Sequence, residues 1–339
     1  RLEALIPRAA VDAEFARGAA WVDRPPEQII QRGSGWGALE LRRREVAGER
    51  PFCPPSMVFD AASLGREQEP WLQLLDQGAF RTSGAVNAPR GYMVQAEWRE
   101  ALEQADRAIL FKTGAKEIGH RFGIMPSFMA KWSQQYPGCS GHLHQSLSDG
   151  RRNLFFDHDG KNGGRHGMSK LFESFLAGQI AVAMEFAPMF WPTINSYKRL
   201  VDGFWAPVKP TWGIDNRTAS FRVIPAGPKS TRLETRCPGS DINPYLAVAA
   251  LLAAGLHGVE KGMKLAAPPI TGTNVGAENI PRAPRSLAAT AEIFRRSATA
   301  RDWLGDDFVE HFALTRDWEW RQWQDAVTDW ELKRYFEII

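Results

Sequence analysis

An arginine-rich stretch over Asn195–Pro244 constrains the fold of this chain more than any other part of its sequence. Its five arginines are Arg199, Arg217, Arg222, Arg232 and Arg236. Arg232, Glu234 and Arg236 alternate, so on a β-strand their side chains would share one face. Arg222 closes a second, shorter alternating pattern. Because a guanidinium fork matches carboxylate and phosphate oxygens, arginines that converge from neighbouring strands predict a pocket for phosphates and a carboxylate substrate.

Glu234 needs a role among these cations. It either neutralises the arginines or holds a metal ion, and the residues alone leave both roles open. The alternative for the whole stretch is a surface lattice of ion pairs, which is a common outcome for charged strands. Apolar residues and glycine–proline breaks surround these arginines instead of a lysine–glutamate face, which favours the pocket.

Length and composition exclude several classes of protein. The chain has 339 residues, 44% of them hydrophobic, so it can bury a core as one large or two medium domains. No apolar run reaches the roughly 18 residues of a transmembrane helix, so no membrane partner is expected. The 42 basic and 39 acidic residues nearly balance, and no basic tract supports nucleic-acid binding.

The cysteines and the first residue bear on the setting of the chain. Cys53, Cys139 and Cys237 are odd in number and widely spaced, which makes neither a disulfide framework nor a zinc motif and predicts a reducing cytoplasm. The chain begins at Arg1 without a charged-then-apolar signal segment. We therefore expect that the start of a longer protein is absent.

Hydrophobic periodicity predicts helices joined to short strands. The expected helices cover 66–81, 97–122, 169–187, a segment from Asp241 or Asn243 to about 258, and the region after Ser286, with a loop over Thr82–Gly91 and a strand over Ile124–Lys131. The tryptophans near the end are predicted to have a packing role and not to form a cofactor site. They are Trp318, Trp320, Trp323 and Trp330.

A second polar pattern lies at His142, His144 and Ser146. These residues alternate, so on a strand they would share one face, opposite Leu143 and Leu147. A lone histidine is usually structural. Two at this spacing, followed by serine, are as consistent with a functional site as with a structural role.

Five motifs follow one another between about Ala101 and the C-terminus. They read H-L-H-Q-S-L, N-S-Y-K-R-L, D-N-R-T-A-S-F-R, R-L-E-T-R and N-P-Y-L-A. Their order closely resembles the catalytic domain of the glutamine synthetase family, and shared order is more specific than any single motif. The resemblance implies an α+β fold in which a curved antiparallel sheet, flanked by helices, forms one wall of an active-site tunnel. It also implies a partial β-grasp-like segment over residues 1–50 and a catalytic domain over residues 51–339.

The activity implied by the resemblance is that of an ATP-dependent amide ligase. Such enzymes phosphorylate the γ-carboxylate of glutamate and let ammonia or an amine displace the phosphate, with Mg²⁺ or Mn²⁺ as the metal. Phosphoryl transfer needs positive charge and metal ions around the transferred oxygens, which agrees with the arginine set. The family forms stacked rings, so a homo-dodecamer or hexamer is expected.

The motifs also imply roles for single residues. Two match ligands of the second metal ion, His142 and Glu234. Three match contacts to glutamate or the transferred phosphoryl group, His144, Arg199 and Arg236. Four match contacts to ATP and its phosphates, Ser146, Arg217, Arg222 and Arg232, of which Arg217 and Arg222 are the expected catalytic arginines.

The flap is the first departure from the family pattern. The family usually carries an acidic residue just before A-P, where it helps to take a proton from ammonium, and this chain has Trp205. Indole accepts no proton, but it can cover an alkylated amine through cation–π attraction. This resembles the γ-glutamyl-amine ligase branch, and the alternative is that Trp205 only packs on the flap.

The first metal site is the second departure. Ala85 and Met93 stand at two positions where the family has glutamates, and neither can bind magnesium. In the stretch A-L-E-L, only Glu40 remains as a candidate ligand.

A third departure lies at Pro7, which runs directly into Arg8 where the family has a longer stretch, so segments are expected to be missing.

Two alternatives to a working ligase stay open. One is a catalytically degenerate homologue with a ligand-binding or structural role. The weaker one is a guanidino-kinase-like phosphotransferase, which H-L-H-Q-S-L and N-P-Y-L-A disfavour.

Overall fold

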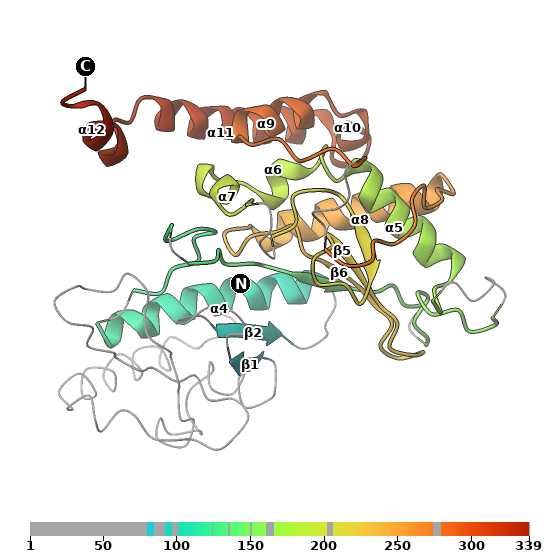
Figure 1. Ribbon diagram of the computed structural model, residues 1–339. Helices are drawn as coiled ribbons and strands as arrows, with labels where there is room; N and C mark the ends of the chain where they lie inside the picture. The colour runs from blue at the N-terminus through green and yellow to red at the C-terminus, as the bar shows by residue number, and fades with distance from the viewer. Residues whose placement is uncertain are drawn as a thin grey trace. The chain divides into compact units, whose positions relative to one another are not determined.

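A computed structural model of the chain describes its C-terminal three-quarters (Figure 1). The described residues are 101–123, 125–134, 136–149, 151–160, 166–201, 206–273 and 279–338, together with the backbone of 80–84 and 92–96. The chain divides into two compact units, Arg1–Phe128 and Met129–Ile339. The predicted domain boundary near residue 50, and with it the β-grasp-like segment, falls outside the described residues.

The first unit contains a strand pair and a long helix. Strand β1 (Phe80–Gly84) pairs antiparallel with β2 (Tyr92–Ala96), and α4 (Ala101–Arg121) follows. The predicted loop over Thr82–Gly91 and the predicted helix over 66–81 were therefore wrong where they overlap β1, because these residues pair with β2 instead of continuing a helix or a turn.

The second unit is built on a four-stranded sheet. Its strands are β3 (Leu143–Gln145), β4 (Trp212–Ile214), β5 (Phe221–Ile224) and β6 (Arg232–Thr235), in the order β3-β6-β5-β4. The β3–β6 and β6–β5 pairs are antiparallel, as predicted, whereas β4 pairs with β5 in parallel. Phe221, Val223 and Leu233 are fully buried, so one face of the sheet joins the core and the opposite face carries the charged side chains.

Two helices pack closely with each other and contact the sheet through a buried amide. They are α5 (Lys170–Val182), capped by Ser169, and α8 (Pro244–Glu260), capped by Asn243, both near their predicted starts. Gln179 of α5 donates to the Leu251 carbonyl of α8 (2.9 Å) and accepts from Thr235 of β6 (3.1 Å). Because this buried amide is hydrogen-bonded to both elements, it fixes α5 and α8 against the apolar side of β6.

The segment predicted as a strand over Ile124–Lys131 is a loop over residues 125–131. Its backbone bonds a side chain in place of a neighbouring strand: Lys131 N–H donates to Asn195 Oδ1, and Asn195 Nδ2 donates to the Lys131 carbonyl, both at 2.7 Å. A single asparagine thus satisfies both backbone groups of Lys131, and the Ala130 carbonyl accepts from Cys139 N–H at 2.8 Å.

Six further helices are described in the second unit. They are α6 (Ala187–Phe190), α7 (Ile194–Lys198), α9 (Leu287–Arg296), α10 (Ala298–Leu304), α11 (Asp306–Gln324) and α12 (Asp329–Tyr335). Figure 1 shows α9, α10 and α11 lying together, and α9 begins after its capping residue Ser286 as predicted. None of the helices in the described part of the chain is long and apolar enough to span a membrane.

The C-terminal tryptophans pack on one another in part and lie outside the core: Trp320 is half-buried, with its ring centroid 4.8 Å from that of Trp323. Trp318, Trp323 and Trp330 are 55%, 41% and 59% exposed. The core side of α11 is occupied by Val309, Phe312 and Ala313 near its start, which leaves the aromatic residues farther along facing outward.

Candidate active site

Strand register gathers three of the predicted site residues into one row across the sheet. His144 of β3 lies opposite Glu234 of β6, which lies opposite Arg222 of β5. The Glu234 carboxylate, 3% exposed, accepts from Arg222 Nη1 at Oε2 (2.9 Å) and from Arg236 Nη1 at Oε1 (2.6 Å). The alternation of Arg232, Glu234 and Arg236 therefore has the structural consequence that the sequence predicted.

The charge of Glu234 is secured by its neighbours. Burial acts to raise the pKa of Glu234, but the hydrogen bond from His142 and the positive charge of Arg236 outweigh it and hold the pKa well below its usual range. The carboxylate therefore stays ionised at every pH at which the protein would work. Breaking this cluster would leave a buried charge without compensation.

The two histidines lie against the same carboxylate. His142 Nδ1 is 3.1 Å from Glu234 Oε1, and His144 Nε2 is 3.8 Å from the same oxygen. Arg232 Nε donates to His144 Nδ1 at 3.1 Å. Burial lowers the pKa of each imidazole to about 4, so both rings are neutral at pH 7.

The other ring nitrogen of His142, Nε2, is available to bind a ligand. Nδ1 lies against Glu234 Oε1 and 3.3 Å from Arg236 Nη1, and the tautomer in which Nδ1 donates to the carboxylate leaves the lone pair on Nε2. This Nε2 is buried and has no hydrogen-bond partner among the described residues. A carboxylate-oriented imidazole with a free lone pair is a common arrangement in metal sites.

These two residues fit a divalent cation only as part of a ligand set. His142 offers one nitrogen and Glu234 its carboxylate. No three His, Cys, Asp or Glu side chains in the described ranges are arranged to hold a metal by themselves. Magnesium is often held by one or two carboxylates together with substrate phosphates, so a partial protein set is chemically sufficient.

Arg199 lies deeper than the other predicted substrate residues. It is 3% exposed and donates to the Cys237 carbonyl (2.9 Å), to Ser140 Oγ (2.8 Å) and to the Arg236 carbonyl (3.3 Å). Burial lowers its pKa to about 10, so it remains charged at neutral pH. Its guanidinium supports the backbone that carries Arg236, and its contact with glutamate stays a prediction.

A second carboxylate fixes the helix that presents Arg199. Arg199 is the C-terminal cap of α7, and the first turn of α7 is held by a capping box between Thr193 and Ser196. Both hydroxyls donate to Asp241 Oδ2, at 2.9 and 2.5 Å. Asp241 thus joins the start of α7 to the segment that follows β6.

The connection from β4 to β5 places Arg217 and a residue that the prediction missed, Asp215. Asp215 accepts from Arg222 Nε at 3.0 Å and also contacts Arg222 Nη2. Arg217 is exposed. The pKa of Arg236 is lowered mainly by burial, and the positive charges of Arg222 and Arg217 lower it further. The signal that could have identified Asp215 is its position directly after the buried β4, where polar residues often line sites.

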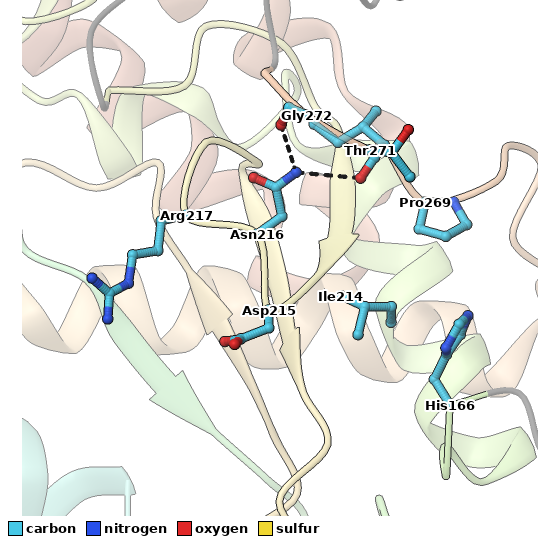
Figure 2. A pocket seen from close by; sticks show the side chains of 9 residues that line it. His166, Ile214, Asp215, Asn216, Arg217, Pro269, Thr271 and Gly272 are labelled. Carbon is cyan, nitrogen blue, oxygen red and sulfur yellow. Dashed lines mark hydrogen bonds between the residues drawn. The ribbon is translucent and has the colours of Figure 1, made fainter.

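An open pocket of about 600 Å³ lies beside this connection, and Asp215 and Arg217 are among its lining residues. Figure 2 shows Asp215 and Ile214 between Arg217 on one side and His166 and Pro269 on the other. Asn216 donates to the Gly272 carbonyl at 2.9 Å, which ties the far wall of the pocket to the connection.

The structure describes only some of the remaining predicted site residues. Ser146 directly follows β3 and is partly buried. Trp205, Glu40 and Ala85 lie outside the described residues. Met93 is in β2, opposite Ser83, where only the backbone is described.

Comparisons with known proteins agree with the fold and the motifs. Residues 86–335 match the family described as glutamine synthetase, catalytic domain. Type-1 glutamine synthetase 2 of Dictyostelium discoideum is 51% identical over 257 residues, which are 74% of this chain and 48% of that protein. Glutamate–isopropylamine ligase of a Pseudomonas species is 41% identical over 289 residues, which are 84% of this chain and 62% of that protein.

Two further proteins extend the comparison. Gamma-glutamylethanolamide synthetase GlnA4 of Streptomyces coelicolor is 41% identical over 253 residues, 74% of this chain and 52% of that protein. A solved structure of a GmaS/ADP complex has a TM-score of 0.69 at 29% identity, covering 78% of this chain and 61% of the other. The chain spans about half the length of the curated relatives that it matches. On the family match and these identities, the chain belongs to the glutamine synthetase family.

Proposed function

We propose that this chain is the catalytic part of an ATP-dependent ligase that joins the γ-carboxylate of glutamate to ammonia or an organic amine through a γ-glutamyl phosphate. The observation that carries the proposal is the Glu234 cluster. An ionised carboxylate is held between Arg222 and Arg236, beside a neutral His142 whose Nε2 is unpartnered within the described residues. Such a cluster combines an incomplete cation site with fixed positive charge, which phosphoryl transfer requires.

The proposed roles of the arginines differ with their positions. Arg222, Arg217 and Arg232 would stabilise the oxygens of the transferred phosphoryl group, while a glutamate oxygen bonds to phosphorus and ADP leaves. Arg236, supported through its carbonyl by Arg199, would bind the carboxylate of glutamate. In the second step the neutral amine nitrogen bonds to the γ-carbon, phosphate leaves with the carbon–oxygen electron pair, and the nitrogen releases a proton to water.

His142 and Glu234 are the residues that would hold Mg²⁺ or Mn²⁺, with the nucleotide phosphates among the other ligands. The metal would supply positive charge that offsets the negative charge of the phosphates. A homo-oligomer, a dodecamer or hexamer as in the family, is part of the proposal. So is a cytoplasmic location, which the free thiols of Cys139 and Cys237 support.

Phosphate release tests the proposed function. The full-length protein is assayed with glutamate, ATP and Mg²⁺, and with ammonia, ethanolamine, isopropylamine or butylamine as the acceptor. We expect release that depends on both glutamate and an amine. Folded protein that binds nucleotide but releases no phosphate with any acceptor would establish the alternative, a catalytically degenerate homologue. That alternative is suggested by Ala85 and Met93, which stand where the family has metal-binding glutamates.

Replacing Arg236 by lysine is expected to raise the KM for glutamate about tenfold, because lysine keeps the charge but loses the fork that binds two carboxylate oxygens. Steady-state kinetics with varied glutamate measures the effect. The KM for the acceptor amine serves as the internal control, because Arg236 is assigned to glutamate and its bond to Glu234 also affects the proposed cation site. An unchanged glutamate KM would remove Arg236 from the substrate site.

Replacing Trp205 by glutamate is expected to shift the preference toward ammonia. A carboxylate can take a proton from ammonium, which indole cannot do, and it removes the aromatic surface offered to an alkyl group. The ratio of kcat/KM for ammonia to that for isopropylamine should rise about tenfold. An unaltered ratio would indicate that Trp205 has only a packing role.

A further inference from the structure

The helix α7, which ends at Arg199, is held in place by contacts from several other segments. It has five residues, and a helix this short is marginal in water by itself, so its position depends on the groups that bind it. Asp241 binds its first turn, and Asn195 bonds both backbone groups of Lys131. Further contacts come from the C-terminal helices α9 and α11, and α11 lies beside α7 (Figure 1).

Arg316 of α11 binds the backbone at the start of α7. Its Nη1 donates to the carbonyl of Pro192, the residue before the N-terminal cap Thr193. The central carbon of the guanidinium is 5.1 Å from the centroid of the Phe312 ring, and Nε donates to Thr315 Oγ1 at 3.2 Å. Both of these residues belong to α11, so the helix that carries Arg316 also orients its side chain toward α7.

A pair of hydroxyl groups joins α7 to α9. The Tyr197 hydroxyl contacts Thr290 Oγ1, and Thr290 is fully buried. The Thr290 hydroxyl donates to the Leu287 carbonyl at 3.1 Å, so its oxygen is left to accept from Tyr197. Because Tyr197 lies two residues before Arg199, this contact fixes the turn of α7 that presents Arg199.

Arg199 links the position of α7 to the Glu234 cluster. Its buried guanidinium donates to the Cys237 carbonyl and to the Arg236 carbonyl. Arg236 in turn donates to Glu234 at 2.6 Å. A shift of α7 would therefore move the backbone that carries Arg236, because closely packed interiors transmit displacements.

We propose that Arg316 and Tyr197 are positioning residues for the glutamate site. They hold α7 against α11 and α9, and α7 places Arg199 where it supports Arg236. The affinity for glutamate is thereby set in part by helices that contribute no residue to the Glu234 cluster. The inference rests on the proposed ligase function, and it adds the C-terminal helices to the determinants of substrate affinity.

Shortening the side chain of Arg316 tests the proposal with a matched control. Arg316→Gln removes the bond to the Pro192 carbonyl, because the glutamine side chain is shorter, whereas Arg316→Lys keeps a long cationic donor. Arg301→Gln is the control. Arg301 is partly buried like Arg316 and donates from Nε to a backbone carbonyl, at 3.0 Å, but that carbonyl belongs to Arg295 of α9. Phosphate release by the full-length protein and the three variants is measured with varied glutamate and with varied amine.

Arg316→Gln is expected to raise the KM for glutamate about fivefold, with kcat and the KM for the amine within about twofold of wild type, because the change moves a binding group and not the reacting atoms. Arg316→Lys should restore the glutamate KM to within about twofold of wild type, and Arg301→Gln should leave it unchanged. A wild-type glutamate KM in folded Arg316→Gln overturns the proposal. An equal rise in Arg301→Gln also overturns it, since the effect would then be a general loosening of the C-terminal helices.

Tyr197→Phe decides the matter if Arg316→Gln does not fold. This change removes one hydroxyl and keeps the ring, whose centroid is 6.1 Å from that of Trp191, and Thr290 keeps its bond to the Leu287 carbonyl. A rise of about threefold in the glutamate KM at constant amine KM supports the positioning role. An unchanged glutamate KM overturns it.

Amide hydrogen exchange separates this inference from the function on which it rests. Exchange over residues 192–200 is followed by mass spectrometry in the wild-type protein and in the variants. If no acceptor supports phosphate release, the ligase fails, and exchange alone decides the positioning role. Exchange about fivefold faster in Arg316→Gln or Tyr197→Phe, with the wild-type rate in Arg301→Gln, supports the role. The wild-type rate in all three variants overturns it.

Discussion

Glu234→Gln is expected to lower turnover by about a thousandfold, the size of effect seen when a key electrostatic group is removed from an active site. Glutamine has the shape of glutamate, but it cannot balance Arg222 and Arg236, whose nitrogens lie 2.9 and 2.6 Å from the carboxylate. It also replaces one carboxylate oxygen by an NH2 group, which cannot accept a hydrogen bond, so the proposed cation site and His142 lose the negative charge that they face. Phosphate release measures turnover, and titration calorimetry with Mn²⁺ measures the cation site.

Glu310→Gln is the matched control for this variant. Glu310 also pairs with two arginines, Arg295 and Arg301, but its side chain is 47% exposed on α11. Exposed ion pairs contribute little, so its activity should stay within about twofold of wild type. Retention of more than a tenth of the wild-type turnover by Glu234→Gln would refute the central role given to this carboxylate.

Gly178→Val is expected to reduce the free energy of unfolding by about 3 kcal/mol, at the upper end of the usual cost of overpacking. A Cβ at Gly178 would lie 2.6 Å from the Gly258 Cα atom and would also meet the Ala254 carbonyl oxygen, so α5 and α8 would have to separate. Movement of α5 would displace Gln179, which bonds Thr235 next to Glu234. Urea denaturation measures the stability, and phosphate release should fall as well.

Ala181→Val provides the comparison on the same helix. Ala181 is exposed, so the added methyl groups meet solvent and the change should stay below about 1 kcal/mol, mostly from helix propensity. Equal destabilisation by the two variants would show that the Gly178–Gly258 contact is not what limits the packing of α5 against α8.

The charged row was predictable because it depends on alternation alone. Once Arg232, Glu234 and Arg236 occupy a strand, geometry puts them on one face, and antiparallel pairing can bring Arg222 beside them. The starts of α5 and α8 were predictable for a similarly local reason, since Ser169 and Asn243 cap their own helices.

Features that depend on distant contacts were not predictable. The burial of Arg199 results from carbonyls more than thirty residues away, at Arg236 and Cys237. At the end of the loop 125–131, the backbone of Lys131 is hydrogen-bonded by a side chain 64 residues later and not by a neighbouring strand. Asp215 gains importance only when a left-handed turn directs it toward Arg222, which no periodicity encodes.

Arg222 shares its donors between two acids, and this has a consequence for how the chain can change. Asp215 and Glu234 both accept hydrogen bonds from the Arg222 guanidinium. The strength with which one carboxylate binds this guanidinium therefore depends on whether the other carboxylate is present. Substitutions at the two positions should therefore be non-additive, with the second change doing less harm than it does alone. Single substitutions at Asp215 or Glu234 would overestimate the combined effect of changing both. The two positions should therefore be altered as a pair.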